Sequence, residues 1–148
     1  NVFIMRKLIL VIVLFTASKS LLSAQTDVSI SPFGLLIPAF VGTVEVPVAD
    51  YIGLEGYLLV IEGGAVANLN GRYYLNPKRG YDGFNIGIFV GGATELGVGP
   101  GFTFGYKTVS ERGLLFDVGF GIGRSLSDGG LPLPYAKLNF GYRFQKRD

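Results

Sequence analysis

The chain has 148 residues, the length of one domain, and its 13 Lys and Arg against 11 Asp and Glu give a formal charge of +2. It contains no Cys and no His, which excludes disulfide frameworks, thiolate metal sites and catalysis by a histidine base. Its basic residues form no long run or patch of the kind that binds nucleic acid, so no nucleic-acid partner is expected.

The first 24 residues are predicted to be an upstream extension followed by a cleaved signal peptide. After residues 1–4, Met5-Arg6-Lys7 forms a basic start, residues 8–15 are an unbroken apolar run, and small residues precede a cleavage site after Ala24. The apolar run is too short to cross a bilayer as a helix, which takes roughly 20 residues. Three of the 13 basic residues lie in this leader, which leaves ten against 11 acidic residues. The remaining domain, residues 25–148, is therefore close to neutral.

Residues 25–148 are predicted to form eight β-strands, because apolar and polar residues alternate between clusters of Gly, Pro, Asp and Asn and no helical period is present. The first strand, residues 27–35, is the least regular because Pro32 and Gly34 interrupt its alternation. The others are expected near residues 39–48, 51–61, 67–75, 84–91, 96–108, 114–123 and 132–144.

The last predicted strand has the strictest alternation. From Ala136 onward, Leu138, Phe140, Tyr142 and Phe144 fall on one face, while Lys137 and Arg143 fall on the other. A strand of about ten residues that is apolar on one side and rich in aromatic residues has the dimensions of a membrane-spanning β-strand.

The bulky apolar face is predicted to point outward. A barrel of about eight strands has an interior that barely holds side chains, and the later strands place their glycines on the face opposite the large apolar residues. A charge on a lipid-exposed face would cost roughly 2–4 kcal/mol, and the strand charges share the glycine-containing face. We therefore expect a paired charge network that fills the lumen, formed by Glu45, Glu55, Arg72, Lys107, Asp117, Lys137 and Arg143. The alternative is a secreted soluble barrel of lipocalin type, with its polar face outward.

The leader, the eight amphipathic strands and the ending Leu138-x-Phe140-x-Tyr142-x-Phe144 resemble small Gram-negative outer-membrane β-barrels of the OmpA and OmpX type. Segments 71–74, 105–107 and 116–121 are more similar to an uncharacterised group within that class. The resemblance implies an eight-stranded antiparallel up-and-down transmembrane β-barrel, monomeric, surrounded by outer-membrane lipid.

The resemblance also assigns a role to the last strand. In that family the final aromatic strand, here Leu138, Phe140, Tyr142 and Phe144, is the signal read by the barrel-assembly machinery after periplasmic chaperones have delivered the chain. The family's aromatic residue is usually the last one, whereas residues 145–148 follow Phe144 here. The chain departs from the family's pattern at this end, so the resemblance does not imply recognition through a terminal carboxylate.

A non-enzymatic structural or envelope-integrity role is the leading hypothesis. Enzymes among outer-membrane barrels use a His with Ser or Asp, and this chain has no His, so neither catalysis nor a cofactor or metal is expected. One alternative is a narrow pore or small-solute channel lined by Glu55, Arg72, Asp117 and Lys137. Another is a surface interaction protein that acts through its extracellular loops, among them residues 125–131.

Overall fold

The computed structural model describes residues 25–145, apart from the side chains of Leu35 and Asp128. The predicted signal peptide, residues 1–24, lies outside the described residues. Within the described part of the chain, no helix is both long and apolar enough to cross a membrane.

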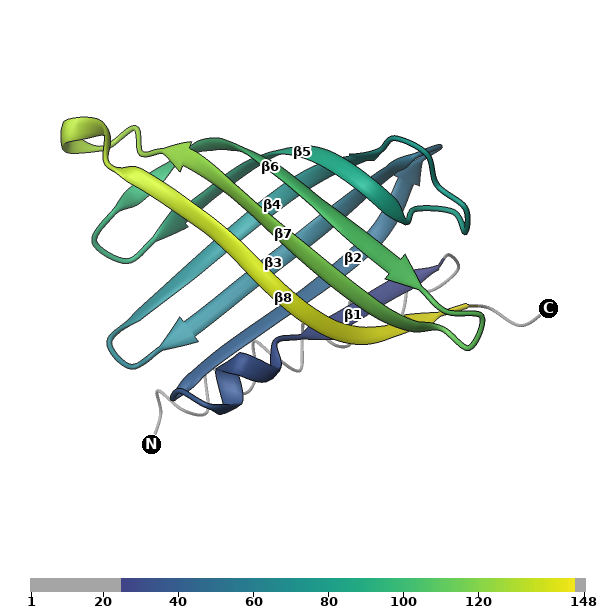
Figure 1. The fold of residues 1–148 in the computed structure, drawn as a ribbon. Coiled ribbons are helices and arrows are strands. Elements are labelled where there is room, and N and C mark those ends of the chain that lie inside the picture. Colours follow the sequence, from purple (N-terminus) through teal and green to yellow (C-terminus); the bar gives the residue numbers. More distant parts are fainter. Residues whose placement is uncertain (1–24, 146–148) are drawn as a thin grey trace.

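Eight antiparallel strands form one closed barrel in which each strand pairs with the next and β8 pairs with β1 (Figure 1). This confirms the predicted all-β, eight-stranded, up-and-down architecture. The strands are β1 Thr26–Ile30, β2 Ala39–Ala49, β3 Ile52–Ile61, β4 Gly64–Tyr74, β5 Gly83–Ala93, β6 Gly97–Val109, β7 Leu114–Arg124 and β8 Pro132–Phe144. Two short 3₁₀ turns, η1 Pro32–Leu35 and η2 Asp128–Gly130, lie in the β1–β2 and β7–β8 connections.

The connections divide the barrel into two ends. The terminal end carries the start of β1, the end of β8 and the β2–β3, β4–β5 and β6–β7 connections. The distal end carries the other four connections, including η1 and η2. Gly63 and Gly113 have backbone φ angles of 81° and 89° in two of the tight turns. Residues other than glycine rarely adopt this conformation.

The first strand is shorter than predicted. The sequence predicts a strand over residues 27–35, but β1 ends at Ile30 and residues 32–35 form η1. Pro32 explains the difference, because its ring fixes φ and removes the N–H that a continued ladder would need. The N–H of Ser31 donates the last backbone hydrogen bond from this segment to β2, at 3.0 Å from the Val41 oxygen.

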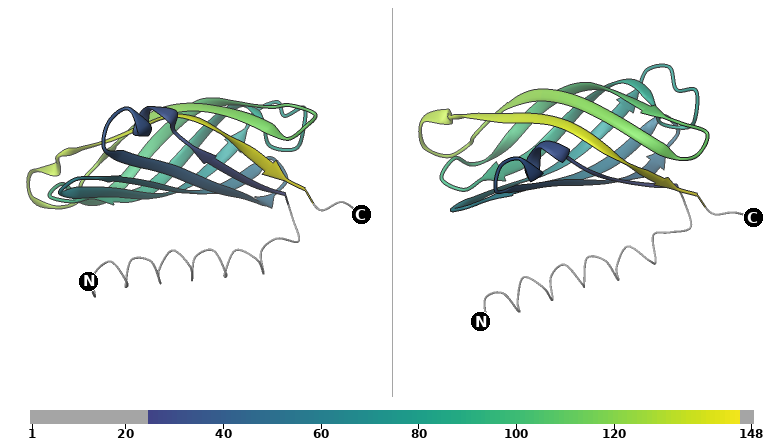
Figure 2. Two further views of the ribbon diagram at one scale, coloured as in Figure 1. Left: turned by 90° about the horizontal axis from the view of Figure 1, so that it is seen from below. Right: turned by 60° about the horizontal axis from the view of Figure 1, so that its bottom comes forward.

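The short β1 leaves the distal half of β8 without a strand partner on one side. β1 pairs only with Phe140–Phe144, whereas β7 pairs along β8 from Pro132 to Tyr142. η1 lies beside this half of β8 (Figure 2). Pro132 and Pro134 lie there and lack an N–H donor, which is typical of edge positions. The Ala136 carbonyl accepts a hydrogen bond from the Tyr57 hydroxyl at 3.2 Å.

Burial alternates from one residue to the next along the strands, and most polar side chains point inside. The largest fully buried side chains are Arg72, Arg143, Tyr74, Lys107, Glu55, Asn70 and Asn139. Most large apolar residues of the strands are exposed, for example Ile88 at 68 % and Phe102 at 71 %. The interior of this barrel is therefore mainly polar, and its outer surface is an apolar band.

Candidate functional site: the charged lumen

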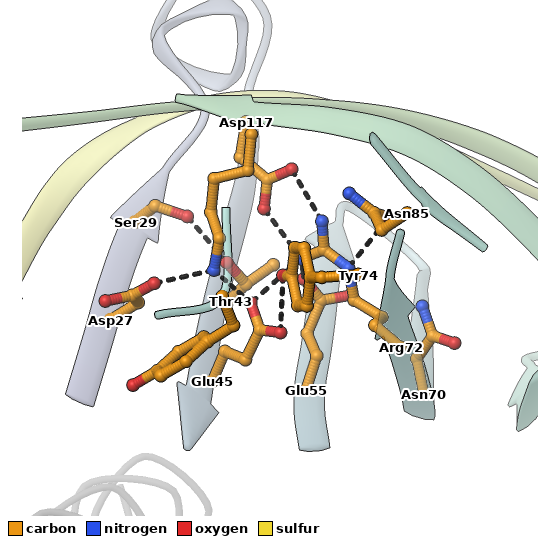
Figure 3. A network of polar contacts seen from close by, with 12 residues as sticks. Asp27, Ser29, Thr43, Glu45, Glu55, Asn70, Arg72, Tyr74, Asn85 and Asp117 are labelled. Atoms are coloured by element: carbon orange, nitrogen blue, oxygen red, sulfur yellow. Dashed lines mark hydrogen bonds and ion pairs between the residues drawn. The ribbon is translucent and has the colours of Figure 1, made fainter. Parts of the chain in front are cut away.

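The structure places all seven charges that the sequence assigns to the lumen in its interior. Each has at most 6 % of its surface exposed, and they come from β2, β3, β4, β6, β7 and β8. Each occupies an inward-facing position of its strand. Figure 3 shows Glu45, Glu55, Arg72 and Asp117 with their side chains directed toward one another. The seven are Glu45, Glu55, Arg72, Lys107, Asp117, Lys137 and Arg143.

Arg72 on β4 is the centre of the network. Its Nη1 lies 3.0 Å from Glu45 Oε2, 2.9 Å from Glu55 Oε2 and 2.8 Å from Asp117 Oδ2. Its Nη2 donates to Asp117 Oδ1 at 3.0 Å, which makes the contact with this carboxylate bidentate. Its Nε donates to Asn85 Oδ1 at 3.2 Å. All the nitrogens of one buried guanidinium therefore have acceptors.

Two lysines extend the network from this centre in opposite directions. Lys137 Nζ contacts Glu55 Oε2 and lies 2.6 Å from Asp117 Oδ2. Lys107 Nζ lies 2.5 Å from Glu45 Oε2 and 2.6 Å from Asp27 Oδ2. Each ammonium therefore bridges two carboxylates.

Asp27 on β1 is a member of the network that the sequence reasoning missed. Its Oδ1 lies 2.6 Å from Arg143 Nε, and its Oδ2 accepts from Arg143 Nη2 at 2.8 Å as well as from Lys107. With Asp27 the inward-facing charges of the strands are four acidic and four basic residues, so their formal charges cancel. The alternation of the other strands is the signal that could have identified Asp27, since it faces inward opposite Glu45 in the β1–β2 register.

Tyrosine hydroxyls complete the carboxylate contacts. Tyr74 donates to Glu45 Oε1 and Tyr135 donates to Glu55 Oε1, both at 2.6 Å. The rings also border the cations, with Lys107 Nζ 5.1 Å from the centre of the Tyr74 ring. These hydrogen bonds go to carboxylate oxygens that make no salt bridge. A buried carboxylate needs hydrogen-bond partners for both of its oxygens.

An aromatic layer lies on the distal side of the charges. Tyr57, Phe89 and Tyr135 are buried, and Val41, Leu59 and Val66 pack against them. The Tyr135 ring lies 5.1 Å from the Tyr57 ring and 5.8 Å from the Phe89 ring, measured between centres. The lumen thus changes from ionic to aromatic along its axis.

The β4–β5 connection closes the terminal end. Asp82 accepts from the backbone N–H groups of Lys78 and Arg79 at 2.7 and 2.9 Å, which holds the connection in shape. Tyr81 is buried and donates to the Gln25 carbonyl at 2.7 Å, and burial raises the pKa of its hydroxyl. Arg143 donates to the Tyr81 and Arg79 carbonyls at 3.0 and 2.5 Å. The last residue of the network is therefore tied to this loop.

Inward glycines leave room for the long polar side chains. A Cβ on Gly53 would lie 2.1 Å from Glu45 Oε1, and one on Gly87 would lie 2.5 Å from Thr103 Oγ1. A Cβ on Gly101 would lie 2.3 Å from Phe89 Cε1. The glycines thus set where the charged and aromatic groups fit.

Three carboxylates of the network form a cluster whose spacing would suit a metal ion. Oxygens of Glu45, Glu55 and Asp117 lie within 4.8 Å of one another, close enough for a metal ion to bridge. Arg72 already contacts all three carboxylates, and Lys107 or Lys137 adds a second cation at each. The carboxylates therefore have protein counter-charges in the positions that a metal would take.

The four residues of the predicted assembly signal lie on the outer face of β8. Phe140, Tyr142 and Phe144 are exposed by 43–50 %, and Leu138 is half-buried. The Phe140 ring packs against Phe116 of β7, with ring centres 5.0 Å apart. Their proposed recognition by an assembly machinery stays a prediction.

Comparisons with protein-family models, curated proteins and solved structures give no match.

Proposed function

We propose that this protein is a non-enzymatic, membrane-spanning β-barrel of a Gram-negative outer membrane, with a structural role in the envelope. The inversion of polarity carries the proposal, since the charged residues of the strands other than Arg124 lie inside and large apolar residues cover the outside. In water such a surface would expose far more contiguous apolar area than soluble monomers show. In a bilayer the same surface is the favourable one.

The strand lengths and the closure support the same proposal. β2 to β8 have 10 to 13 residues, and a tilted strand needs about 9–11 to cross the hydrocarbon core. A closed barrel satisfies the backbone hydrogen bonds that lipid cannot satisfy. Aromatic pairs such as Phe84 with Tyr106 and Tyr142 with Phe144 lie near the terminal ends of the strands, where an interfacial girdle is expected.

The filled lumen favours a structural role over the pore alternative. A conducting path needs groups that hold an ion weakly, but the lumen charges here contact one another at hydrogen-bonding distances. The aromatic layer of Tyr57, Phe89 and Tyr135 and the buried Tyr81 add barriers on both sides of the charges. We infer that the lumen serves to stiffen the barrel.

Two measurements test the proposal. The purified protein should need detergent to stay in solution, and an unboiled sample should migrate differently from a boiled one on a denaturing gel. In planar bilayers it should give no steady single-channel current, with an open porin as the positive control. Solubility without detergent and no gel shift would contradict the membrane barrel. Steady currents would contradict the closed lumen alone and favour the pore.

A further inference from the structure

Arg124 is the exception to the charge pattern of the strands. Among the strands of residues 25–145, the other charged side chains are buried in the lumen, but Arg124 ends β7 with an exposed side chain and the outward parity of Phe120 and Ile122. The described side chains include no ion-pair partner for it. A guanidinium beside an apolar band requires a counter-charge from its surroundings.

The guanidinium has a defined position at the distal end. A Cβ on Gly130 would lie 2.5 Å from Arg124 Nε and 3.0 Å from its Nη2, so the side chain lies against the backbone of the β7–β8 connection. Gly130 has φ of 58° and provides the space. Arg124 therefore lies at the boundary between the apolar band and the loops.

An apolar groove of about 790 Å³ leads away from Arg124 across the outer face. Five of its lining residues are consecutive partners in the strand register, Leu54, Gly71, Ile88, Phe102 and Ile122. Leu54 is near the start of β3, at the terminal end, whereas Arg124 is at the distal end of β7. Because barrel strands are tilted, this row runs diagonally over the height of the barrel.

Gly71 gives the groove its depth. It is outward-facing between Leu69 and Tyr73, and a Cβ there would meet no atom closer than the Ile88 oxygen at 3.9 Å. The missing side chain thus leaves space between Leu69, Ile88 and Phe102, which all line the groove. The result is an apolar channel that ends beside one cation.

We propose that this groove binds one phosphate-bearing acyl lipid, with its phosphate on Arg124 and an acyl chain along Gly71. Arginine pairs well with phosphate, and the apolar groove suits a hydrocarbon chain. The inference rests on the proposed membrane function. In the orientation that the predicted signal peptide implies, the distal end faces outward, so the occupant is the phosphorylated lipid A glycolipid of the outer leaflet.

Native mass spectrometry of the full protein, purified in detergent and stripped of lipid, tests this proposal. Titration with lipid A should give one bound molecule. Arg124→Gln should weaken lipid A binding by about tenfold, as expected when one charge-assisted hydrogen bond is lost, and should leave phosphatidylcholine binding unchanged. Arg124→Lys should retain part of the preference for lipid A.

Gly71→Leu should fill the groove and weaken the binding of both lipids. Gly56→Leu is the matched control, because Gly56 is also outward-facing, has the Val44 oxygen 4.0 Å from an added Cβ, and does not line the groove. Asp128→Asn controls for a carboxylate in the same loop and should not weaken lipid A binding. Both Leu variants should show the wild-type gel shift, which separates loss of this site from failure of the membrane barrel.

Three results would overturn the assignment. Wild-type affinity for lipid A in Arg124→Gln would exclude a phosphate contact at this residue. Equal binding by Gly71→Leu and Gly56→Leu would exclude the groove as the acyl site. Phosphatidylglycerol bound as tightly as lipid A would exclude the glycolipid as the specific occupant.

Discussion

The buried guanidinium of Arg72 depends on its partners, and they depend on it. Taking a charge out of water costs several kcal/mol, and only well-placed opposite charges offset this cost. Arg72 contacts Glu45, Glu55 and Asp117, so its loss would remove one of the two counter-charges from each of three buried carboxylates. Replacing one charged residue of the network by an uncharged one should therefore lower the stability of the barrel strongly.

Arg72→Met tests this dependence. The three carboxylates would keep only the lysines as cations, so we expect the free energy of unfolding in detergent or lipid to fall by about 3–5 kcal/mol. Arg112→Met, in the exposed β6–β7 turn, is the control and should change stability by less than about 0.5 kcal/mol. Chemical denaturation followed by circular dichroism measures both.

A milder variant keeps the test decisive if Arg72→Met does not fold. Tyr135→Phe removes only the hydroxyl that donates to Glu55 Oε1, and it should cost about 1.5–3 kcal/mol. Stability equal to the wild type in both variants would show that the lumen charges are not held by one another.

The alternation along the regular strands was enough to predict which residues carry the lumen charges. It could not predict which of these charges contact one another. Arg143 and Asp27 are 116 positions apart, and Lys137 and Glu55 are 82 apart. Such contacts exist only because closure brings the strands around one axis. Asp27 was missed because the sequence around Pro32 and Gly34 obscured the alternation of its strand.

At the scale of the strand, inward glycines face large inward side chains on neighbouring strands. Gly101 and Gly123 are cross-strand partners, and Phe89 of β5 packs its ring over both. A barrel of eight strands has a narrow interior, so a large group on one strand requires small ones beside it. Glycine in these strands is therefore a packing requirement as well as a source of flexibility.

Gly101→Ala should destabilise the barrel by about 1–3 kcal/mol through overpacking, because the new Cβ would lie 2.3 Å from Phe89 Cε1 and 2.6 Å from the Gly123 Cα. Gly71→Ala, on the outer face, should change stability by less than about 0.5 kcal/mol. Denaturation of the two variants provides the comparison. A second change, Phe89→Leu, should recover part of the loss in Gly101→Ala, and equal stability of the two single variants would contradict inward packing at Gly101.

Strand positions were predictable from period-two alternation where one face is uniformly apolar. Strand three was predicted at residues 51–61 and lies at Ile52–Ile61, and strand six was predicted at 96–108 and lies at Gly97–Val109. The end of the first strand was wrong by about five residues, since the structure turns at Pro32. The local sequence pattern does not distinguish a proline that ends a strand from one that lies within it, like Pro47 in β2.

At the scale of the molecule, the outer surface separates the proposed membrane barrel from a soluble one. Ile88→Lys places a charge at the middle of β5, on a side chain that is 68 % exposed. In a bilayer this should cost about 2–4 kcal/mol, whereas on a water-exposed surface it should cost almost nothing. Leu126→Lys, in the β7–β8 connection and 81 % exposed, is the control. Unfolding from lipid vesicles measures the difference, and equal stability of the two variants would contradict a membrane position for β5.

The sequence by itself determined the number of strands and the face on which most charges lie, because alternation is a local property that each strand carries independently. The tertiary structure decided how the barrel closes between β1 and β8, which makes Asp27 the fourth acidic residue of the lumen. It also decided which charge meets which, and it placed Arg124 at the end of an outer groove. These features depend on register and tilt around the whole barrel, so no single strand contains the information that sets them.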